Sequence, residues 1–348
     1  MDTSNMSVLL GNSSVRGMNV STSHFPAAIK PLNLFIACFV SVSFLVGTIV
    51  NGLFLWVLGV KMKRTINTLW FLHLILIHLI SSSYMPFFVA YILLGSHWAF
   101  GKALCKVLNF SSSLGMFTTV FLLTIVSLDL YLLTCHPIWS QHNRTISRAQ
   151  KLITGTWLVS FALSTPYLFF RETQETTEGK IQCVNNYALS NNWEAVEMQA
   201  FRNRIHLVFF VGRVLLAFVI PLVIIAGCYY SIGWKMKKKK LTRTGKPFKV
   251  LTAAVASFFL CWFPYHLSQA SLVFQASEQM VKFLQLMSII AVCLNFCFTP
   301  VLYLFVGEKF QQVFKTSVLA LLQKGFADAS IIPEGNINPS EEVHHCVS

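Results

Sequence analysis

Long apolar runs are the feature of this sequence that most limits its fold. They alternate with short polar stretches, and each is roughly 20 to 30 residues long, enough to cross a bilayer as a helix. Lipid offers backbone groups no hydrogen-bond partner, so a spanning chain forms helices or a closed barrel. The runs lack the alternating polarity of barrel strands. The sequence therefore predicts an all-α membrane protein, a seven-transmembrane helix bundle. We expect the spans at 32–60, 67–94, 102–135, 148–170, 205–236, 247–275 and 278–306.

The composition and the placement of charge support a membrane protein and exclude a soluble domain. The chain is 55% hydrophobic and only 11% charged, whereas about a quarter of the residues of a soluble domain are charged. The net charge of +14 is concentrated in connectors such as 61–64 and 235–249. Because cytoplasmic connectors carry an excess of lysine and arginine, we place these stretches inside, facing anionic lipid. This distribution argues against a nucleic-acid partner.

The ends of the chain complete the predicted topology. Residues 1–31 are polar and carry Asn-X-Ser sequons at Asn5, Asn12 and Asn19, so we expect an extracellular, glycosylated tail without a cleavable signal peptide. The bundle then occupies 32–306 of a multi-pass plasma-membrane protein. We expect 307–322 to form an amphipathic eighth helix on the inner leaflet, and 323–348 to be a disordered cytoplasmic tail.

Arg213 is the strongest functional candidate that the residues alone provide. A charged side chain in an apolar helix is unfavourable unless it faces the bundle interior and finds a partner. The planar guanidinium suits a carboxylate or a phosphate, although a snorkelling or internally paired arginine is the open alternative. His73 and His78 have no Cys, Asp or Glu at metal-ligand spacing, so we expect no metal. No catalytic grouping is visible either, so we expect neither an enzyme nor a cofactor.

Several short motifs follow one another along the predicted spans. They are Asn51, Cys105, Asp129-Leu130-Tyr131, Trp157, Cys183, Pro221, Tyr229, Phe258, Cys261-Trp262-Phe263-Pro264 and Pro300-Val301-Leu302-Tyr303. In this order they resemble the rhodopsin-type (class A) G-protein-coupled receptors. The run HPIWSQHNRT after the third span, together with TPYLFFRET and GKIQC, is similar to the chemoattractant branch of that family, which includes the formyl-peptide receptors and the second prostaglandin D2 receptor.

The resemblance implies roles for particular residues. It implies a disulfide between Cys105 and Cys183, a Gi-type G protein as partner, and an anionic peptide or lipid as the extracellular ligand. Thr316, Ser317, Ser330, Ser340 and Ser348 are thinly spread, so arrestin stays an open alternative as a further partner. The implied ligand pocket is Arg213 with Ser112, Ser113, Met116, Tyr265, His266 and Gln285. The implied activation switch is Asp129, Leu130, Tyr131, Tyr229, Phe258, Trp262, Pro264, Pro300 and Tyr303, although the aromatic members could be core filling alone.

The chain departs from the family pattern at two functional places. His78 stands where the family has a sodium-binding aspartate, and Thr299 replaces the asparagine before Pro300, so we expect no sodium site. Leu130 replaces the arginine that pairs with the neighbouring aspartate and meets the G protein. We therefore expect Asp129 to lose its partner and coupling to be weakened. A non-signalling decoy or scavenger is the main alternative, and a transporter the lesser one, because the two halves of the chain show no repeat.

Overall fold

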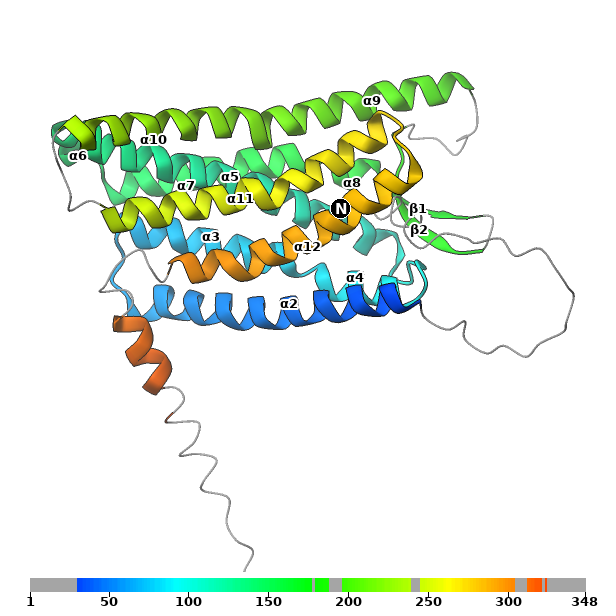
Figure 1. Ribbon diagram of the computed structural model, residues 1–348, viewed down its shortest axis with the longest axis horizontal. Coiled ribbons are helices and arrows are strands. Elements are labelled where there is room, and N and C mark those ends of the chain that lie inside the picture. Colours follow the sequence, from blue (N-terminus) through cyan, green and yellow to red (C-terminus); the bar gives the residue numbers. More distant parts are fainter. Residues whose placement is uncertain are drawn as a thin grey trace, which may run out of the picture.

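The computed structural model describes residues 30–176, 179–187, 196–238, 245–303, 312–320 and 323, without the side chains of 196–197, 245–250 and 298–303. Within these residues, seven helical segments are long and apolar enough to cross a membrane, which confirms the predicted seven-helix bundle. The helices lie lengthwise beside one another, with a β-hairpin at one end and the short helix α6 at the other (Figure 1). We call these the hairpin end and the opposite end.

The spans and the connections between them contain the following helices and strands. In chain order they are α2 (Pro31–Trp56), the π-helical turn η2 (Val57–Lys61), α3 (Ile66–Ser82), α4 (Met85–Leu93), α5 (Gly101–Cys135), α6 (Pro137–Asn143), α7 (Ile146–Ser164), α8 (Pro166–Phe170), β1 (Arg171–Glu175), β2 (Ile181–Asn185), α9 (Val196–Val214), the π-helical turn η3 (Leu215–Val219), α10 (Ile220–Lys238), α11 (Gly245–Val273) and α12 (Glu278–Tyr303).

Proline divides two of the spans that we expected to be continuous. Pro86 lies in the first turn of α4 and Pro166 begins α8. Proline has no backbone N–H, so a helix accepts it in its first turn, where that donor would have no partner. The second span is therefore α3 followed by α4, and the fourth is α7 followed by α8.

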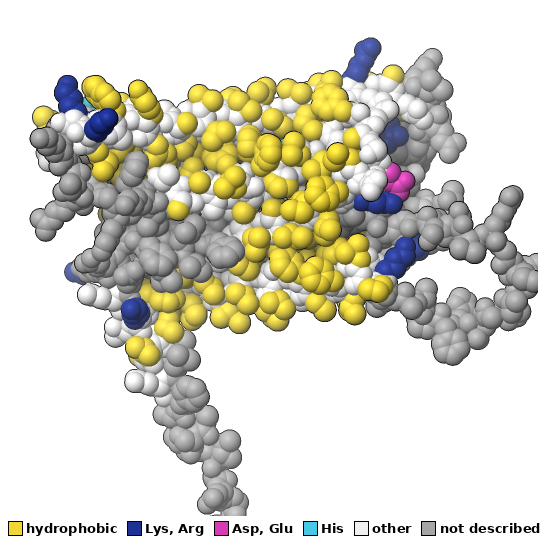
Figure 2. All heavy atoms as spheres, in the orientation of Figure 1, with side chains coloured by type: hydrophobic (Ala, Val, Ile, Leu, Met, Phe, Trp, Pro, Cys, Tyr) yellow, Lys and Arg dark blue, Asp and Glu magenta, His cyan; other side chains and the backbone are white. Residues whose placement is uncertain are grey.

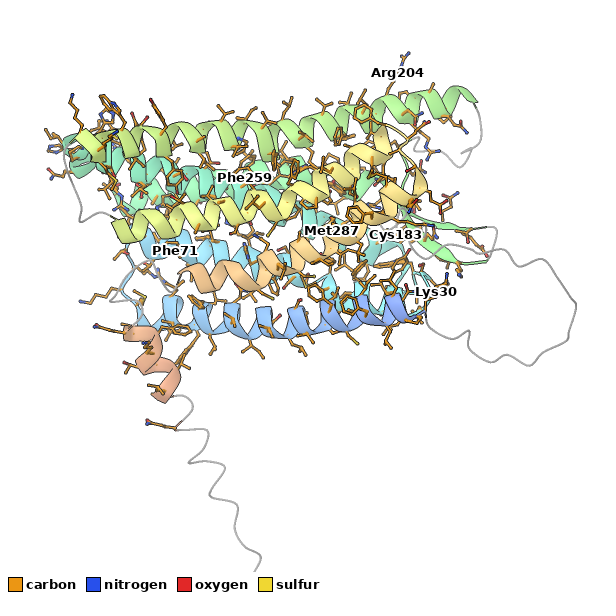
Figure 3. All side chains as sticks on the ribbon, in the orientation of Figure 1. Lys30, Phe71, Cys183, Arg204, Phe259 and Met287 are labelled. Atoms are coloured by element: carbon orange, nitrogen blue, oxygen red, sulfur yellow. A yellow bond between two sulfur atoms is a disulfide. The ribbon has the colours of Figure 1, made fainter. Side chains whose placement is uncertain are left out.

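The fifth span begins earlier than the sequence predicted. We expected a loop over 171–204, but its first part forms β1 and β2, and helix α9 begins at Val196 rather than at residue 205. Because α9 continues through η3 into α10, this helix is about 60 Å long, roughly twice the thickness of the hydrocarbon layer. Its first turns hold Arg202 and Arg204, and Arg204 points away from the bundle in Figure 3. Hydropathy marks the part of a helix that lies in lipid, so it missed these polar turns.

The outer surface of the bundle is apolar between its two ends. Figure 2 shows hydrophobic side chains along the whole length of the visible face, while lysine and arginine side chains gather at the ends. Phe35, Ile49 and Val223 are each more than 60% exposed on this surface. Water-soluble proteins rarely expose continuous apolar surface of this extent, whereas lipid tails cover it. The surface supports the membrane assignment independently of helix length.

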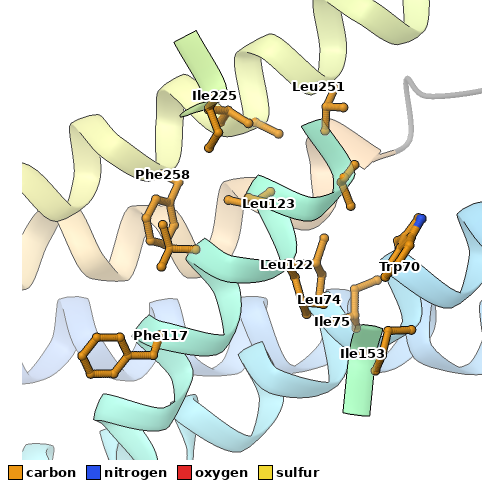
Figure 4. Packing of buried hydrophobic residues seen from close by; sticks show 14 of the residues in the cluster. Trp70, Leu74, Ile75, Phe117, Leu122, Leu123, Ile153, Ile225, Leu251 and Phe258 are labelled. Atoms are coloured by element: carbon orange, nitrogen blue, oxygen red, sulfur yellow. The ribbon is translucent and has the colours of Figure 1, made fainter. Parts of the chain in front are cut away.

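The interior contains a hydrophobic cluster in which α5 is the central helix. Leu122 and Leu123 of α5 are buried among residues of α3, α7, α10 and α11, including Trp70, Ile153 and Phe258 (Figure 4). A second cluster lies toward the hairpin end and contains the disulfide cysteines. Buried side chains from so many helices fix the helices relative to one another.

Two glycines allow helices to approach closely. A Cβ atom on Gly47 of α2 would lie 2.1 Å from the ring of Phe296 on α12, and one on Gly115 of α5 would lie 2.4 Å from the Ser81 Cβ of α3. Beside the first contact, the Asn51 Nδ2 donates to the carbonyls of Gly47 and Phe296. Small residues at helix contacts are the usual means by which membrane helices pack.

A short helix at the opposite end continues the chain after the seventh span. Residues 312–320 are helical, and the Phe314 ring lies 4.7 Å from the Phe54 ring of α2. The described part of the expected amphipathic helix at 307–322 is therefore helical. Its placement on the inner leaflet stays a prediction.

Candidate functional site

A disulfide fixes the β-hairpin over the hairpin end of the bundle. Cys105 near the start of α5 and Cys183 of β2 are bonded, with Cα atoms 5.8 Å apart, which confirms the predicted pair. Strands β1 and β2 pair antiparallel, with Thr173 opposite Cys183. The Trp98 amide also donates to the Ile181 carbonyl, so the hairpin has a second attachment. The β-hairpin is therefore fixed to the bundle by a disulfide and by a backbone hydrogen bond.

Arg213 of α9 lies beside aromatic side chains from two other helices. Its Nη1 donates to the Tyr265 hydroxyl of α11 at 2.7 Å. Its guanidinium carbon lies 5.3 Å from the centre of the Tyr167 ring on α8 and 6.0 Å from that of Tyr265. Tyr265 is buried, and Arg213 itself is partly buried. The arginine therefore faces neighbouring helices rather than lipid, which is the arrangement expected of a functional cation.

Two other predicted pocket residues, His266 and Gln285, have buried polar side chains. The His266 ring packs 5.1 Å from the Phe218 ring and 5.4 Å from the Tyr265 ring. Both ring nitrogens of His266 and the Oε1 atom of Gln285 are buried and have no hydrogen-bond partner among the described residues. Buried polar atoms are nearly always satisfied, so such atoms require a functional or solvent partner. They support a site that accepts polar groups.

The remaining predicted pocket residues contact other parts of the bundle as well. Ser113 accepts a hydrogen bond from the Ser164 hydroxyl of α7 at 3.1 Å. Met116 belongs to the central hydrophobic cluster. Ser112 lines a cavity around Trp262. Of the six residues predicted beside Arg213, Tyr265 accepts its hydrogen bond, and His266 packs against Tyr265.

This cavity lies around Trp262, about one turn along α11 from Tyr265 toward the opposite end. Its volume of about 40 Å³ is enough for a few water molecules. Its lining residues are His78, Ser81, Ser82, Tyr84, Met85, Ser112, Gly115, Thr119, Trp262, Val292, Asn295 and Phe296. The indole N–H of Trp262 is buried without a partner among the described residues. None of the described residues that line this cavity carries a carboxylate, the oxygen ligand that hard cations prefer.

Aromatic rings of α11 connect the two levels of the bundle. The Tyr265 ring lies 5.4 Å from the Trp262 ring, which lies 5.9 Å from the Phe258 ring in the central cluster. Pro264 lies inside this helix, between Trp262 and Tyr265. Tyr265, which binds Arg213, therefore begins a continuous row of packed rings that ends at Phe258 in the central cluster.

At the opposite end, the structure corrects the prediction that Asp129 loses its partner. Arg144 binds the Asp129 carboxylate with two hydrogen bonds, from Nε at 2.8 Å and from Nη2 at 2.9 Å. The Trp70 indole N–H also donates to this carboxylate, at 3.3 Å. Leu130 instead packs against the central cluster. The prediction considered only the residue adjacent in sequence, whereas the guanidinium comes from the connector that follows α6.

The other predicted switch residues have varied environments. Tyr131 exchanges a hydrogen bond with His136 at 3.2 Å, and Tyr229 is partly buried against the central cluster. The side chains of Pro300 and Tyr303 lie outside the described part of the chain, as do the sequons at 5, 12 and 19.

Sequence reasoning missed two residues of the Arg213 region. Tyr167 was not singled out, although it forms one aromatic wall of the group. Arg171, the first residue of β1, is only 1% exposed, and its Nη1 donates to the Cys183 carbonyl at 3.2 Å. A charged residue directly after the apolar run of α8 was a signal that could have identified it. The candidate site therefore consists of Arg213, Tyr167, Tyr265 and His266. It lies in the hairpin half of the bundle, and the packed rings of α11 extend from it toward the core.

The chain belongs to the rhodopsin family of seven-transmembrane receptors. The family described as "7 transmembrane receptor (rhodopsin family)" matches residues 50–303. Receptors of this family bind an extracellular ligand and act on G proteins, so the chain is a multi-pass membrane receptor and not an enzyme.

Comparison with individual receptors places the chain more narrowly within this family. It is 46% identical to human "Probable G-protein coupled receptor 33" over 332 residues, which cover 95% of this chain and 98% of that protein. The Rattus rattus protein of the same name is 46% identical over 85% of this chain and 87% of its own length. Human "Chemerin-like receptor 1" is 35% identical over 87% of this chain and 83% of its own length. The predicted chemoattractant branch is thereby confirmed.

Proposed function

We propose that this chain is a plasma-membrane chemoattractant receptor whose ligand is an anionic peptide or lipid that presents a carboxylate or phosphate to Arg213. The observation that carries the proposal is the position of Arg213 inside the hairpin half of the bundle. There its guanidinium contacts a neutral phenol and two aromatic rings. A ligand anion would add a charge-assisted contact that these neutral groups do not supply.

The distribution of acidic residues supports a carboxylate brought by the ligand. Between residues 198 and 277 the sequence contains no Asp or Glu, and between residues 3 and 171 Asp129 is the only one. The fifth and sixth spans therefore offer Arg213 no carboxylate over that stretch. Glu172 at the hairpin end is bound to Lys102 at 2.8 Å. A second guanidinium, that of Arg171, is buried at the hairpin end. The positive potential of this region favours an anionic ligand.

The orientation follows from charge at the opposite end. Lys61, Arg148, Lys235 and Lys238 lie there or in the adjoining turns, which supports a cytoplasmic location for that end and an extracellular N-terminus. Ligand binding at Arg213 would act through Tyr265, Trp262 and Phe258 on the inner end of α11, where a Gi-type G protein is the proposed partner.

The test compares paired ligands that differ in one charge. Peptides are assayed as free acids and as C-terminal amides, and fatty acids beside their methyl esters, for binding to the natural chain and to Arg213→Gln. We expect the acid to bind at least tenfold more tightly than its neutral partner, because truncating one member of a buried charge pair costs about 2–5 kcal/mol. Arg213→Gln removes this preference, while Arg204→Gln, whose side chain points away from the bundle, retains it.

If acids and amides bind with the same affinity, or if Arg213→Gln keeps the preference for the acid, Arg213 is a structural cation and the proposal is wrong.

A decoy receptor is the second candidate, and Leu130 is the observation that favours it. A receptor without the usual arginine at this position could bind and internalise ligand without activating a G protein. Ligand uptake without any second-messenger change would support the decoy, whereas Gi activation at matched surface expression would exclude it.

A further inference from the structure

We propose that Arg144 replaces, from the connector between α6 and α7, the resting-state restraint that Leu130 cannot provide. In this account the Asp129–Arg144 ion pair holds the coupling end of the bundle closed, and its release precedes G-protein activation. The inference uses the orientation proposed above but not the nature of the ligand.

Asp129 is well suited to this restraint because no other acid lies near it in sequence. It is the only acidic residue between residues 3 and 171. Its side chain is 18% exposed and that of Arg144 is 23% exposed. A bidentate pair at this depth is screened less than a surface pair and has a defined geometry.

The pair connects three segments rather than two. Asp129 belongs to α5, and Arg144 to the connector that ends α6. The Arg144 Nη2 also donates to the Asn67 side chain of α3, and the Trp70 indole of α3 donates to Asp129. Loss of the pair would therefore free the connector from both α3 and α5. Segments of this kind, held by a few polar contacts, are where switching transitions occur.

The connector also holds Arg144 in position. Its amide donates to the Ser140 carbonyl of α6 at 2.9 Å, and the next residue, Thr145, caps the start of α7 by accepting from the Arg148 amide. Arg144 is thus fixed between two helix ends, with its side chain directed at Asp129. A residue held on both sides loses little further freedom when it forms the pair.

Leu130 occupies the position where the family arginine would compete for the same carboxylate. Its side chain packs against the central cluster, so it offers Asp129 no donor. Arg144 is therefore the guanidinium that Asp129 binds among the described residues. This predicts a specific dependence: the effect of Arg144 should be large with leucine at position 130 and small with arginine there.

The experiment measures ligand-independent G-protein activation by the full-length receptor at matched surface expression. Asp129→Asn and Arg144→Gln are each expected to raise basal activity several-fold. The double variant should match the single variants, because both changes remove the same contact. Lys151→Gln, which removes an exposed charge from α7, is the control and should leave basal activity unchanged.

The same comparison in a Leu130→Arg background tests the replacement itself. There the introduced guanidinium can bind Asp129, so we expect Arg144→Gln to change basal activity less than twofold. The proposal is overturned if Arg144→Gln has the same effect in both backgrounds or lowers activity in the natural one. It is also overturned if only the Leu130→Arg chains ever signal, because Arg144 then restrains no coupling. Failure of the ligand proposal would leave these ligand-free measurements unaffected.

Discussion

Replacing Gly47 by alanine tests how closely α2 and α12 pack. The new Cβ would lie 2.1 Å from the Phe296 ring, whereas ordinary contacts begin at 3.4 Å, so the ring or the helices must move by about 1.3 Å. Phe296 is only 5% exposed and lies in the second hydrophobic cluster, so it has little free space to enter. Forcing extra atoms into a packed core typically costs about 1–3 kcal/mol.

That free energy has a measurable consequence. We expect Gly47→Ala to lower the midpoint of thermal unfolding of the purified receptor by several degrees, since about 1 kcal/mol corresponds to about 2–4 °C in a domain of roughly 200 residues. The assay is thermal unfolding in detergent, without ligand. Gly52→Ala on the same helix is the control, because a Cβ there meets nothing within 4 Å. Alanine should stabilise that position slightly, by about 0.5–1 kcal/mol.

A second substitution makes the test specific to the contact. Phe296→Leu in the Gly47→Ala background shortens the opposing side chain and should recover part of the lost stability. If Gly47→Ala unfolds at the same temperature as the natural chain, or if Phe296→Leu brings no recovery, the close contact between these helices is not as described.

Three further substitutions give distinct expectations. Cys183→Ser removes the disulfide and should lower the free energy of unfolding by about 2–5 kcal/mol; a natural chain whose unfolding is insensitive to a reducing agent would contradict this. Tyr265→Phe removes the acceptor of the Arg213 hydrogen bond while keeping the ring, and should lower the free energy of unfolding of the ligand-free receptor by about 1.5–3 kcal/mol; an unchanged unfolding midpoint would show that the bond contributes nothing. Phe314→Ala removes the ring contact with Phe54, worth about 0.5–1.5 kcal/mol beyond its buried area, so amides of 312–320 should exchange hydrogen faster; unchanged exchange would mean that other contacts hold this helix.

Much of the fold was predictable because lipid imposes a simple rule on sequence. Runs of apolar residues identified all seven spans, and the polar interruptions identified the connectors. The early start of α9 at Val196 was not predictable in this way, because its first turns lie beyond the apolar layer and leave no hydropathy signal. The breaks before α4 and α8 carried a signal in Pro86 and Pro166, but hydropathy averages over single residues.

The site was predictable where one residue is unusual in its surroundings. Arg213 stands out as a cation in an apolar helix, and the structure places its guanidinium against the Tyr265 hydroxyl. Ser113 was harder, because it lies one residue from Ser112 and only the helix phase decides which of the two faces a cavity. The Asp129–Arg144 pair joins residues 15 positions apart across the end of a helix, a relationship that adjacent-residue motifs do not express.

Ligand-driven Gi activation is the measurement that tests the central claim most directly. Cells expressing the natural chain, Arg213→Gln and Leu130→Arg at equal surface density are compared over a concentration series of a carboxylate ligand found by the paired binding assay. We predict that the natural chain responds, and that Arg213→Gln requires at least tenfold more ligand. A natural chain that responds no better than Arg213→Gln, or that stays silent while Leu130→Arg responds, would contradict a signalling receptor that reads an anion through Arg213.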